Sequence, residues 1–254
     1  FGNLAGTVIL ILEIVSDVQD WSVSLDTYAV AVQGGGNGFA VLRVIPPADA
    51  PAGSNLTVWV MCFDAEKRYS ADCRVTTLVN QVYGLGTTVS PAQASLDPGG
   101  KAIFRVNVRN LANGPDRCMV GTIALPSGWG LTLFGPDGQM TGLEGFDIPY
   151  KGAGWFDVVV AAPMNAMTGA YQILGDVTDG GGNRGEYAFT LDVNQVFGVW
   201  LEAPAAMISG EPRSRVGFEL NITNTGNGVD AFQLAATGLP PGWRKVEFRD
   251  MAGA

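Results

Sequence analysis

A strand-like segment of alternating apolar and polar residues occurs twice in this chain, 114 residues apart. The first copy, residues 104–110 (FRVNVRN), is followed nineteen residues later by Trp129. The second copy, residues 218–224 (FELNITN), is followed at the same distance by Trp243. Such self-similarity indicates that one structural unit has been copied along the chain. A period of two indicates strands with one buried and one solvated face.

A second repeated segment predicts where the unit begins and ends. Residues 80–84 (NQVYG) return as residues 194–198 (NQVFG), again 114 positions later. We therefore expect one complete unit at residues 84–197. It is preceded by the C-terminal part of another unit at 1–83 and followed by the N-terminal part of a third at 198–254.

The complete unit is expected to hold about seven short strands. Apolar stretches alternate with turn-forming residues, and the 35 glycines and 14 prolines of the chain suit a turn-rich fold. No stretch keeps a helical period. Strands with turns about every 8–12 residues are typical of an all-β, immunoglobulin-like sandwich. In the flanking parts we expect strands at residues 4–15, 216–222, 232–236 and 246–248.

The composition excludes several classes of function. The net charge of −9 gives no basic surface for nucleic acid. The chain has no histidine, which removes the commonest general base and transition-metal ligand. The apolar run 4–15 is too short to span a bilayer, which takes about 20 residues. Charged residues are only 15% of the chain, so the surface favours cover by glycans or neighbouring chains.

The two partial units leave two interpretations open. The chain is either a piece of a longer array of repeats, or a subunit whose incomplete ends are completed by its neighbours, as in donor-strand polymers. Two repeats of 114 residues account for 228 of the 254 residues. The excess favours the first interpretation, because clean complementation would leave no overlap.

Three cysteines and two sequons are candidate modification sites. Cys62 and Cys73 flank an expected hairpin, which predicts a cross-strand disulfide in an oxidising exterior; the alternative is two reduced thiols. Cys118 has no partner in sequence and is expected to be buried or paired outside this segment. Asn55 and Asn221 begin N-x-Thr sequons on the polar face of their strands, and are candidate glycosylation sites.

A glycine-rich hairpin is the candidate metal site. Asp176, Asp179 and Asn183 could present oxygen ligands to Ca²⁺, although their spacing differs from an EF-hand loop and a solvated hairpin is the alternative. Asp64 and Glu66 occupy the corresponding hairpin of the first unit. No other cofactor is expected.

The tryptophans fall into two groups. Trp21, Trp129 and Trp243 recur at one position of the unit, which favours core packing behind a turn over a platform for sugar stacking. Trp59 is out of phase with the apolar residues of its strand, so we expect it outside, where it could serve a contact.

Residues 221–243 resemble a known group of repeats. They read N-x-G-x-x-x-D from Asn224 to Asp230 and then L-P-x-G-W up to Trp243, and residues 110–129 repeat this pattern without the first glycine. This pattern is similar to the bacterial and archaeal immunoglobulin-like repeats of NEW3 or CARDB-like type. The resemblance implies a sandwich fold without chemistry of its own, in a cell-surface, S-layer-like or adhesive protein or an accessory module of a glycoside hydrolase.

We therefore expect a structural segment of a secreted, repeat-built surface or filament protein, without enzymatic activity. Its partners would be other copies of itself or neighbouring repeats, and glycans are a further possibility. Two alternatives remain: a carbohydrate-binding or adhesion module, and an accessory region of a larger surface enzyme. Short linkers such as 80–84 would leave neighbouring modules little freedom and give a stiff rod.

Overall fold

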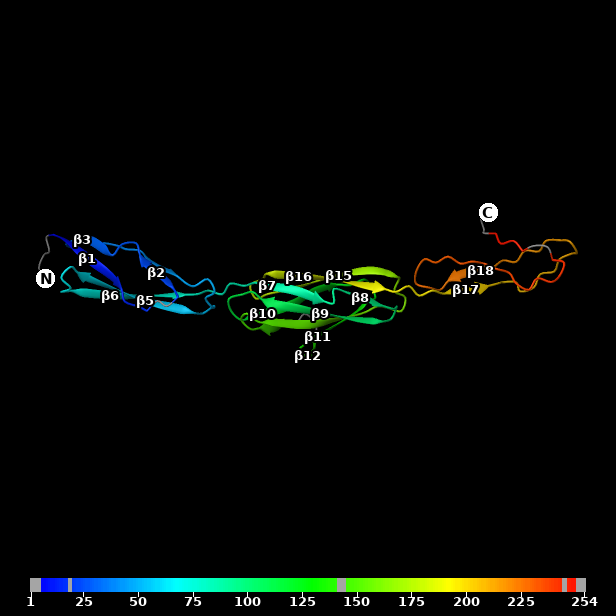
Figure 1. Ribbon diagram of the computed structural model, residues 1–254, viewed down its shortest axis with the longest axis horizontal. Coiled ribbons are helices and arrows are strands. Elements are labelled where there is room, and N and C mark those ends of the chain that lie inside the picture. Colours follow the sequence, from blue (N-terminus) through cyan, green and yellow to red (C-terminus); the bar gives the residue numbers. More distant parts are fainter. Residues whose placement is uncertain (1–5, 18–19, 141–144, 244–245, 250–254) are drawn as a thin grey trace.

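The computed structural model describes residues 6–17, 20–140, 145–243 and 246–249. Three groups of strands lie end to end along one axis, and no helix occurs among these residues (Figure 1). We call residues 7–78 the first module, 85–193 the middle module and 199–243 the last module. The fold is all-β and immunoglobulin-like, as the sequence predicts.

The middle module is a sandwich of two five-stranded sheets. One sheet has the order β13-β10-β15-β16-β8 and the other β12-β11-β14-β9-β7. All pairs are antiparallel except β16 with β8, which is parallel. The strands are β7 (Leu85–Ser90), β8 (Gln93–Leu96), β9 (Lys101–Asn110), β10 (Asp116–Ala124), β11 (Gly130–Gly135), β12 (Gly138–Met140), β13 (Gly145–Ile148), β14 (Ala153–Ala161), β15 (Gly169–Thr178) and β16 (Arg184–Val193).

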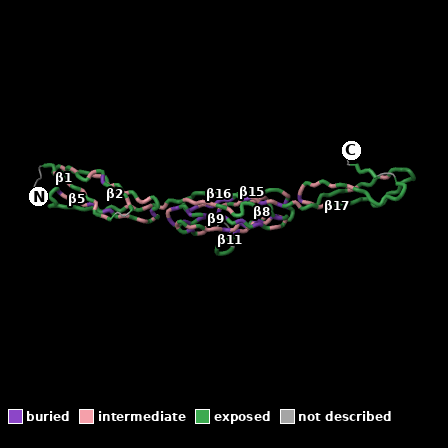
Figure 2. Tube along the Cα trace, viewed as in Figure 1, coloured by how far each residue is buried: buried purple, intermediate pink, exposed green. Residues whose placement is uncertain are grey.

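The alternating segment is the central strand of this sandwich. Phe104, Val106 and Val108 of β9 have no exposed surface, while the residues between them face outward. Across the core, the Phe104 ring stacks on Phe189 of β16 with centroids 4.0 Å apart. Burial is concentrated in this module (Figure 2). The period-two reading of residues 104–110 is therefore confirmed.

The middle module has ten strands where about seven were expected. Its first edge is divided into β7 and β8 at Pro91, which has no N–H to donate to a ladder. β7 pairs with β9 in one sheet and β8 with β16 in the other, so the two short strands bridge the sandwich. Two further short strands, β12 and β13, lie on either side of residues 141–144.

The first module repeats part of this arrangement. Its main sheet has the order β3-β1-β5-β6, and β2 pairs with β4 beside it. β1 lies between β3 and β5 just as β10 lies between β13 and β15. The strands are β1 (Thr7–Ile14), β2 (Ser22–Leu25), β3 (Ala29–Gln33), β4 (Leu42–Ile45), β5 (Asn55–Asp64) and β6 (Ser70–Leu78).

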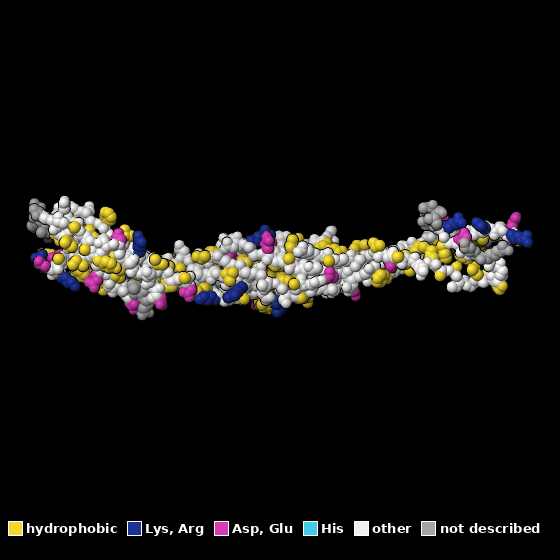
Figure 3. All heavy atoms as spheres, turned by 45° about the horizontal axis from the view of Figure 1, so that its top comes forward, with side chains coloured by type: hydrophobic (Ala, Val, Ile, Leu, Met, Phe, Trp, Pro, Cys, Tyr) yellow, Lys and Arg dark blue, Asp and Glu magenta, His cyan; other side chains and the backbone are white. Residues whose placement is uncertain are grey.

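The last module holds one pair of strands, β17 (Val199–Glu202) and β18 (Asn221–Asn224). Its register, Val199 opposite Asn224, repeats that of Leu85 opposite Asn110 in the middle module. The strands expected at 232–236 and 246–248 do not form, and β18 covers only the end of the expected 216–222 strand. A strand needs a partner, and the described part of this module has no counterparts of β13 and β15. Apolar side chains consequently remain on its surface (Figure 3).

Candidate functional site: the module junctions

The junction between the first and middle modules centres on one asparagine. The Asn113 side-chain amide donates to the carbonyl oxygens of Ala50, in the first module, and Asn80, in the linker, at 3.2 and 3.0 Å. Its Oδ1 accepts from the backbone N–H of Val82 at 2.8 Å, and its backbone N–H donates to the Val82 carbonyl at 3.2 Å. Asn113 therefore ties the middle module, the linker and the first module together.

The second junction has the same set of bonds, 114 residues further on. The Asn227 amide donates to the carbonyl oxygens of Ala166 and Asn194, at 3.1 and 2.9 Å. Its Oδ1 accepts from Val196 N–H at 2.7 Å, and its backbone N–H donates to the Val196 carbonyl at 3.1 Å. We call this arrangement, made by Asn113 or Asn227, the asparagine clasp.

Backbone and glutamine contacts extend each clasp. The carbonyl of Asn113 accepts from Ala52 N–H at 2.8 Å, and that of Asn227 accepts from Thr168 N–H at 2.9 Å. Each linker glutamine donates to a carbonyl just past the clasp, with distances of 2.8 Å for Gln81 to Pro115 and 3.0 Å for Gln195 to Val229. The bonds of the clasp, the backbone and the linker glutamine thus recur at both junctions.

A second asparagine in each loop presents the clasp residue. The Asn110 amide donates to the Gly114 carbonyl at 2.9 Å, and its Oδ1 accepts from Ala112 N–H at 2.8 Å. These bonds close a tight loop at the end of β9, so that Asn113 points back toward the linker. Side-chain amides that bond their own backbone nearby are typical of such turns.

The residue after each clasp asparagine is a glycine because the preceding module comes very close. A Cβ atom on Gly228 would lie 2.4 Å from Thr168 Cγ2, and one on Gly114 would lie 3.0 Å from Ala52 Cβ. Both distances are shorter than ordinary van der Waals contact. The Asn-Gly pair therefore serves the docking of two modules as well as the turn.

The first junction has an additional contact. The Tyr150 hydroxyl donates to the Asp49 carbonyl at 3.1 Å, and the Lys151 ammonium lies 3.8 Å from the Asp49 carboxylate. A hydrogen bond with Tyr150 raises the pKa of Lys151 above its ordinary value. This exposed pair adds to the clasp at the first junction without replacing any of its bonds.

The clasp holds modules in place through hydrogen bonds. Its side chains are uncharged amides, which do not titrate, so its bonds do not depend on pH in the ordinary range. Within the described residues, no group of three or more His, Cys, Asp or Glu side chains could hold a metal ion. The arrangement can set the orientation of one module relative to the next.

The candidate calcium residues have structural partners. Asp179 Oδ1 accepts from the N–H groups of Gly181 and Asn183 at 3.0 and 2.7 Å, and Oδ2 accepts from the Asn183 amide at 2.9 Å. Asp176 pairs with Arg184 at 3.0 Å. Both carboxylates are buried and take part in bonds within the hairpin, and calcium binding stays a prediction.

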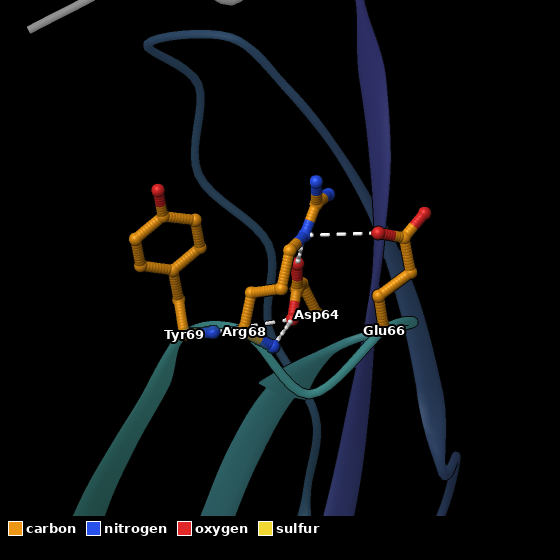
Figure 4. A network of polar contacts seen from close by, with 4 residues as sticks. All are labelled: Asp64, Glu66, Arg68 and Tyr69. Atoms are coloured by element: carbon orange, nitrogen blue, oxygen red, sulfur yellow. Dashed lines mark hydrogen bonds and ion pairs between the residues drawn. The ribbon is translucent and has the colours of Figure 1, made fainter.

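The corresponding hairpin of the first module is closed in the same way (Figure 4). Asp64 Oδ1 accepts from the N–H groups of Arg68 and Tyr69 at 2.6 and 3.2 Å, while Arg68 Nε lies 3.1 Å from Asp64 and 3.0 Å from Glu66. Burial alone would raise the pKa of Asp64, but these hydrogen bonds hold it below its ordinary value. Asp64 and Asp179 are therefore equivalent hairpin caps.

The expected disulfide is not formed. Cys62 and Cys73 are free thiols, because Cys62 lies opposite Ala71 and Cys73 opposite Val60 in the β5–β6 ladder. Diagonal neighbours in a ladder lie about 7–8 Å apart, beyond the usual Cα separation of a disulfide. Cys118 is buried, as expected, and burial raises its pKa to about 11.

The recurring tryptophans share a turn but differ in packing. The N–H groups of Trp129 and Trp243 donate to the carbonyls of Pro126 and Pro240 at 3.3 and 3.2 Å. Trp129 is half-buried and packs on Tyr171 with centroids 4.9 Å apart, and Trp21 is also half-buried. Trp243 is 64% exposed, so the expected core packing does not hold there. The last module has no described counterpart of the strand that carries Tyr171.

Trp59 lies outside, as expected, and its contacts are internal. The indole N–H donates to the Asp72 carboxylate at 2.8 Å, and the Arg74 guanidinium lies 4.8 Å from the ring centroid. The sequon residues Asn55 and Asn221 are both exposed on strands, and their glycosylation stays a prediction.

Sequence analysis did not assign the clasp residues. The loops N-L-A-N-G (110–114) and N-T-G-N-G (224–228) both carry Asn, then Asn-Gly three residues later. Those recurring polar residues, between strands that otherwise conserve only hydrophobicity, were the available signal. It entered only as part of the resemblance to immunoglobulin-like repeats.

Comparisons with known proteins do not assign a family. No protein-family model matches the chain, and no curated protein matches it. Similar solved structures include the protocadherin γB4 extracellular domain, at 10% identity and a TM-score of 0.42; the match covers 85% of this chain and 32% of that one. A family 123 glycoside hydrolase from Clostridium perfringens is also similar, at 9% identity and a TM-score of 0.34; the match covers 44% of this chain and 27% of that one. The chain therefore spans about a third or less of either. No described helix is long and apolar enough to cross a membrane.

Proposed function

We propose that this chain is a structural segment of a secreted, repeat-built surface or filament protein, in which sandwich modules form a stiff rod. The observation that carries the proposal is the asparagine clasp, which occurs at both junctions with the same donors and acceptors. A linker without such bonds would let neighbouring modules reorient, which is the usual expectation where little surface is shared.

Several features of the clasp support stiffness. Each clasp asparagine satisfies carbonyl oxygens from two separate segments, the linker and the preceding module, so neither can move without breaking a bond. Leaving such partly buried groups unpaired costs about 1–3 kcal/mol each. The close approach at Gly114 and Gly228 adds a steric limit to bending.

The surface location is part of the proposal. Low charge, two exposed sequons and the resemblance to immunoglobulin-like surface repeats support it. Labelling of intact source cells with antibodies raised against the middle module tests it. Signal that appears only after permeabilisation would contradict it.

Small-angle X-ray scattering of the full chain tests the rod. We expect a narrow distribution of maximum dimension for the unmodified chain and a shorter, broader one for Asn113→Ala. The matched control is Asn107→Ala, on the outward face of β9, which removes an amide of the same size away from the junction. A broad distribution in the unmodified chain would overturn the proposal.

A further inference from the structure

The parallel pair β8–β16 joins the segment by which the chain enters the middle module to the segment by which it leaves. The chain reaches this module through Gly84 at one end and leaves it after Val193 at the opposite end (Figure 1). β8 belongs to the first segment of the module and β16 to the last, and their residues pair from Gln93 opposite Thr190 to Leu96 opposite Val193. A pull on the two linkers therefore draws β8 and β16 in opposite directions along their length.

From this topology we infer that the β8–β16 pair is a mechanical clamp, giving the middle module a load-bearing function. Backbone hydrogen bonds cross between strands, so sliding one strand past the other loads all of them together. Peeling two strands apart from one end would instead break the bonds one at a time. A short ladder therefore resists separation best when it is pulled in shear.

The clamp has backbone and side-chain components. The N–H of Thr190 donates to the Ala92 carbonyl at 2.9 Å, and the N–H of Asn194 donates to the Leu96 carbonyl at 2.8 Å. Beside them, the Gln93 amide donates to the Asp192 carboxylate at 2.5 Å. These bonds span the whole length of β8.

Two further bonds reinforce the ends of the clamp. The Asn194 side-chain amide donates to the Asp97 carboxylate at 2.8 Å, where β16 leaves the module. At the other end, the Thr87 hydroxyl of β7 donates to the Glu186 carbonyl of β16 at 2.7 Å. β7 also pairs with β9 over six residues, from Leu85 to Ser90, and a pull on Gly84 loads that ladder in shear as well.

Load from the last module reaches the clamp directly because the second clasp lies next to it. Asn194 donates a bond to Leu96 through its backbone N–H and accepts one from the Asn227 amide through its carbonyl. The inference deepens the proposed function and rests on it, since a rod under tension is where such a clamp acts. Its test measures force, whereas the rod is tested by shape, so the two can fail separately.

Single-molecule pulling on the full chain in two directions tests the clamp without altering it. Pulling by the chain ends shears β8 against β16. Handles on Pro98→Cys and Phe197→Cys, with Cys62 and Cys73 changed to Ser, pull both strands from the same end and peel them apart. We expect the end-to-end unfolding force of the middle module to exceed the peeling force roughly twofold, since forced unfolding reports the barrier along the pulled direction. Equal forces would overturn the inference.

A pair of proline variants tests the ladder itself. The carbonyls of Ala92 and Leu96 face β16, so by strand alternation the N–H of Ala94 also faces β16, while that of Ser95 points to the open edge. Proline is tolerated where a strand N–H faces solvent. We expect Ala94→Pro to lower the end-to-end force and Ser95→Pro to leave it unchanged. Should Ala94→Pro fail to fold, Gln93→Ala replaces it; equal forces for that variant and the unmodified chain would count against the clamp.

Discussion

Asn110 and Asn224 close equivalent loops with equivalent bonds but differ in burial. The Asn110 amide lies 2.9 Å from the Gly114 carbonyl, and the Asn224 amide lies 2.8 Å from the Gly228 carbonyl. Asn110 is only 3% exposed and also donates to the carbonyls of Ile148 and Pro149, each at 3.2 Å. Asn224 is exposed. The Asn110 side chain is therefore anchored in the core of its own module, whereas the Asn224 side chain is not.

The same substitution should consequently cost different amounts at these two sites. Asn110→Ala leaves buried carbonyl groups without a donor, and we expect it to destabilise the middle module by about 2–3 kcal/mol. Asn224→Ala, which exposes its partners to water, should cost less than about 1 kcal/mol. Native-state hydrogen exchange, read separately for each module, measures both. Equal losses of protection would contradict this account.

The aromatic core of the middle module offers a matched pair of a different kind. Phe104 has no exposed surface and stacks on Phe189, whereas its repeat equivalent Phe218 is 48% exposed. Phe104→Ala should destabilise the middle module by about 3–5 kcal/mol, as is usual for a buried Phe. Phe218→Ala should change the stability of the middle module by less than about 0.5 kcal/mol. Urea denaturation, followed by the exchange protection of β9 amides, provides the measurement.

The buried thiol of Cys118 should titrate late and make the middle module sensitive to alkali. Burial, together with the charges of Asp116 and Asp179, raises its pKa from 9.0 to about 11. An unfolded chain would lose this proton first, so stability is retained below pH 9 and falls as the pH rises from about 9 to 11. Cys118→Ala should remove this part of the pH dependence. Denaturation midpoints at a series of pH values measure it.

Thiol labelling under native conditions tests the same burial. A disulfide reagent at pH 8 should modify the exposed Cys73 rapidly and Cys118 only on unfolding, because the thiolate is the reactive species. Modification of Cys118 at the rate of Cys73 would show that the core opens in the native state.

The steric limit at the second junction can be tested by a double substitution. Gly228→Ala places a methyl group against Thr168 Cγ2 and should disturb the junction, broadening the distribution of maximum dimension in solution scattering. Thr168→Ser removes that methyl group while keeping the hydroxyl that bonds the Val193 carbonyl at 3.0 Å. The double variant should recover part of the loss, since contacting residues couple. Additive effects would contradict the proposed close approach.

Periodicity predicted the strands that have partners on both sides. β9 was recognisable because Phe104, Val106 and Val108 alternate with polar residues. In the structure those three side chains are buried and the residues between them face outward. β12 and β13 are too short for a period to be read. The strand expected at 232–236 shows the opposite error, because alternation there does not supply a neighbouring strand.

The junctions were harder to read because their chemistry lies in the backbone. The acceptors of Asn113 are carbonyl oxygens of Ala50 and Asn80, which no side-chain pattern reports. Spacing did identify the hairpin of Asp176 and Asp179, although it could not tell ligands from hairpin caps. It also placed Cys62 and Cys73 on adjacent strands, but the ladder register that separates them depends on the turn between β5 and β6.

The reliance of the clasp on main-chain acceptors has an evolutionary consequence. Substitution of the residue at 50, 80, 166 or 194 leaves its carbonyl oxygen in place, so a donor module can recognise a neighbour of quite different sequence. Gene duplication followed by divergence would preserve the coupling as long as the Asn-Gly pair survives. Lineages could therefore lengthen, shorten or shuffle such arrays while each new neighbour still docks at the inherited angle.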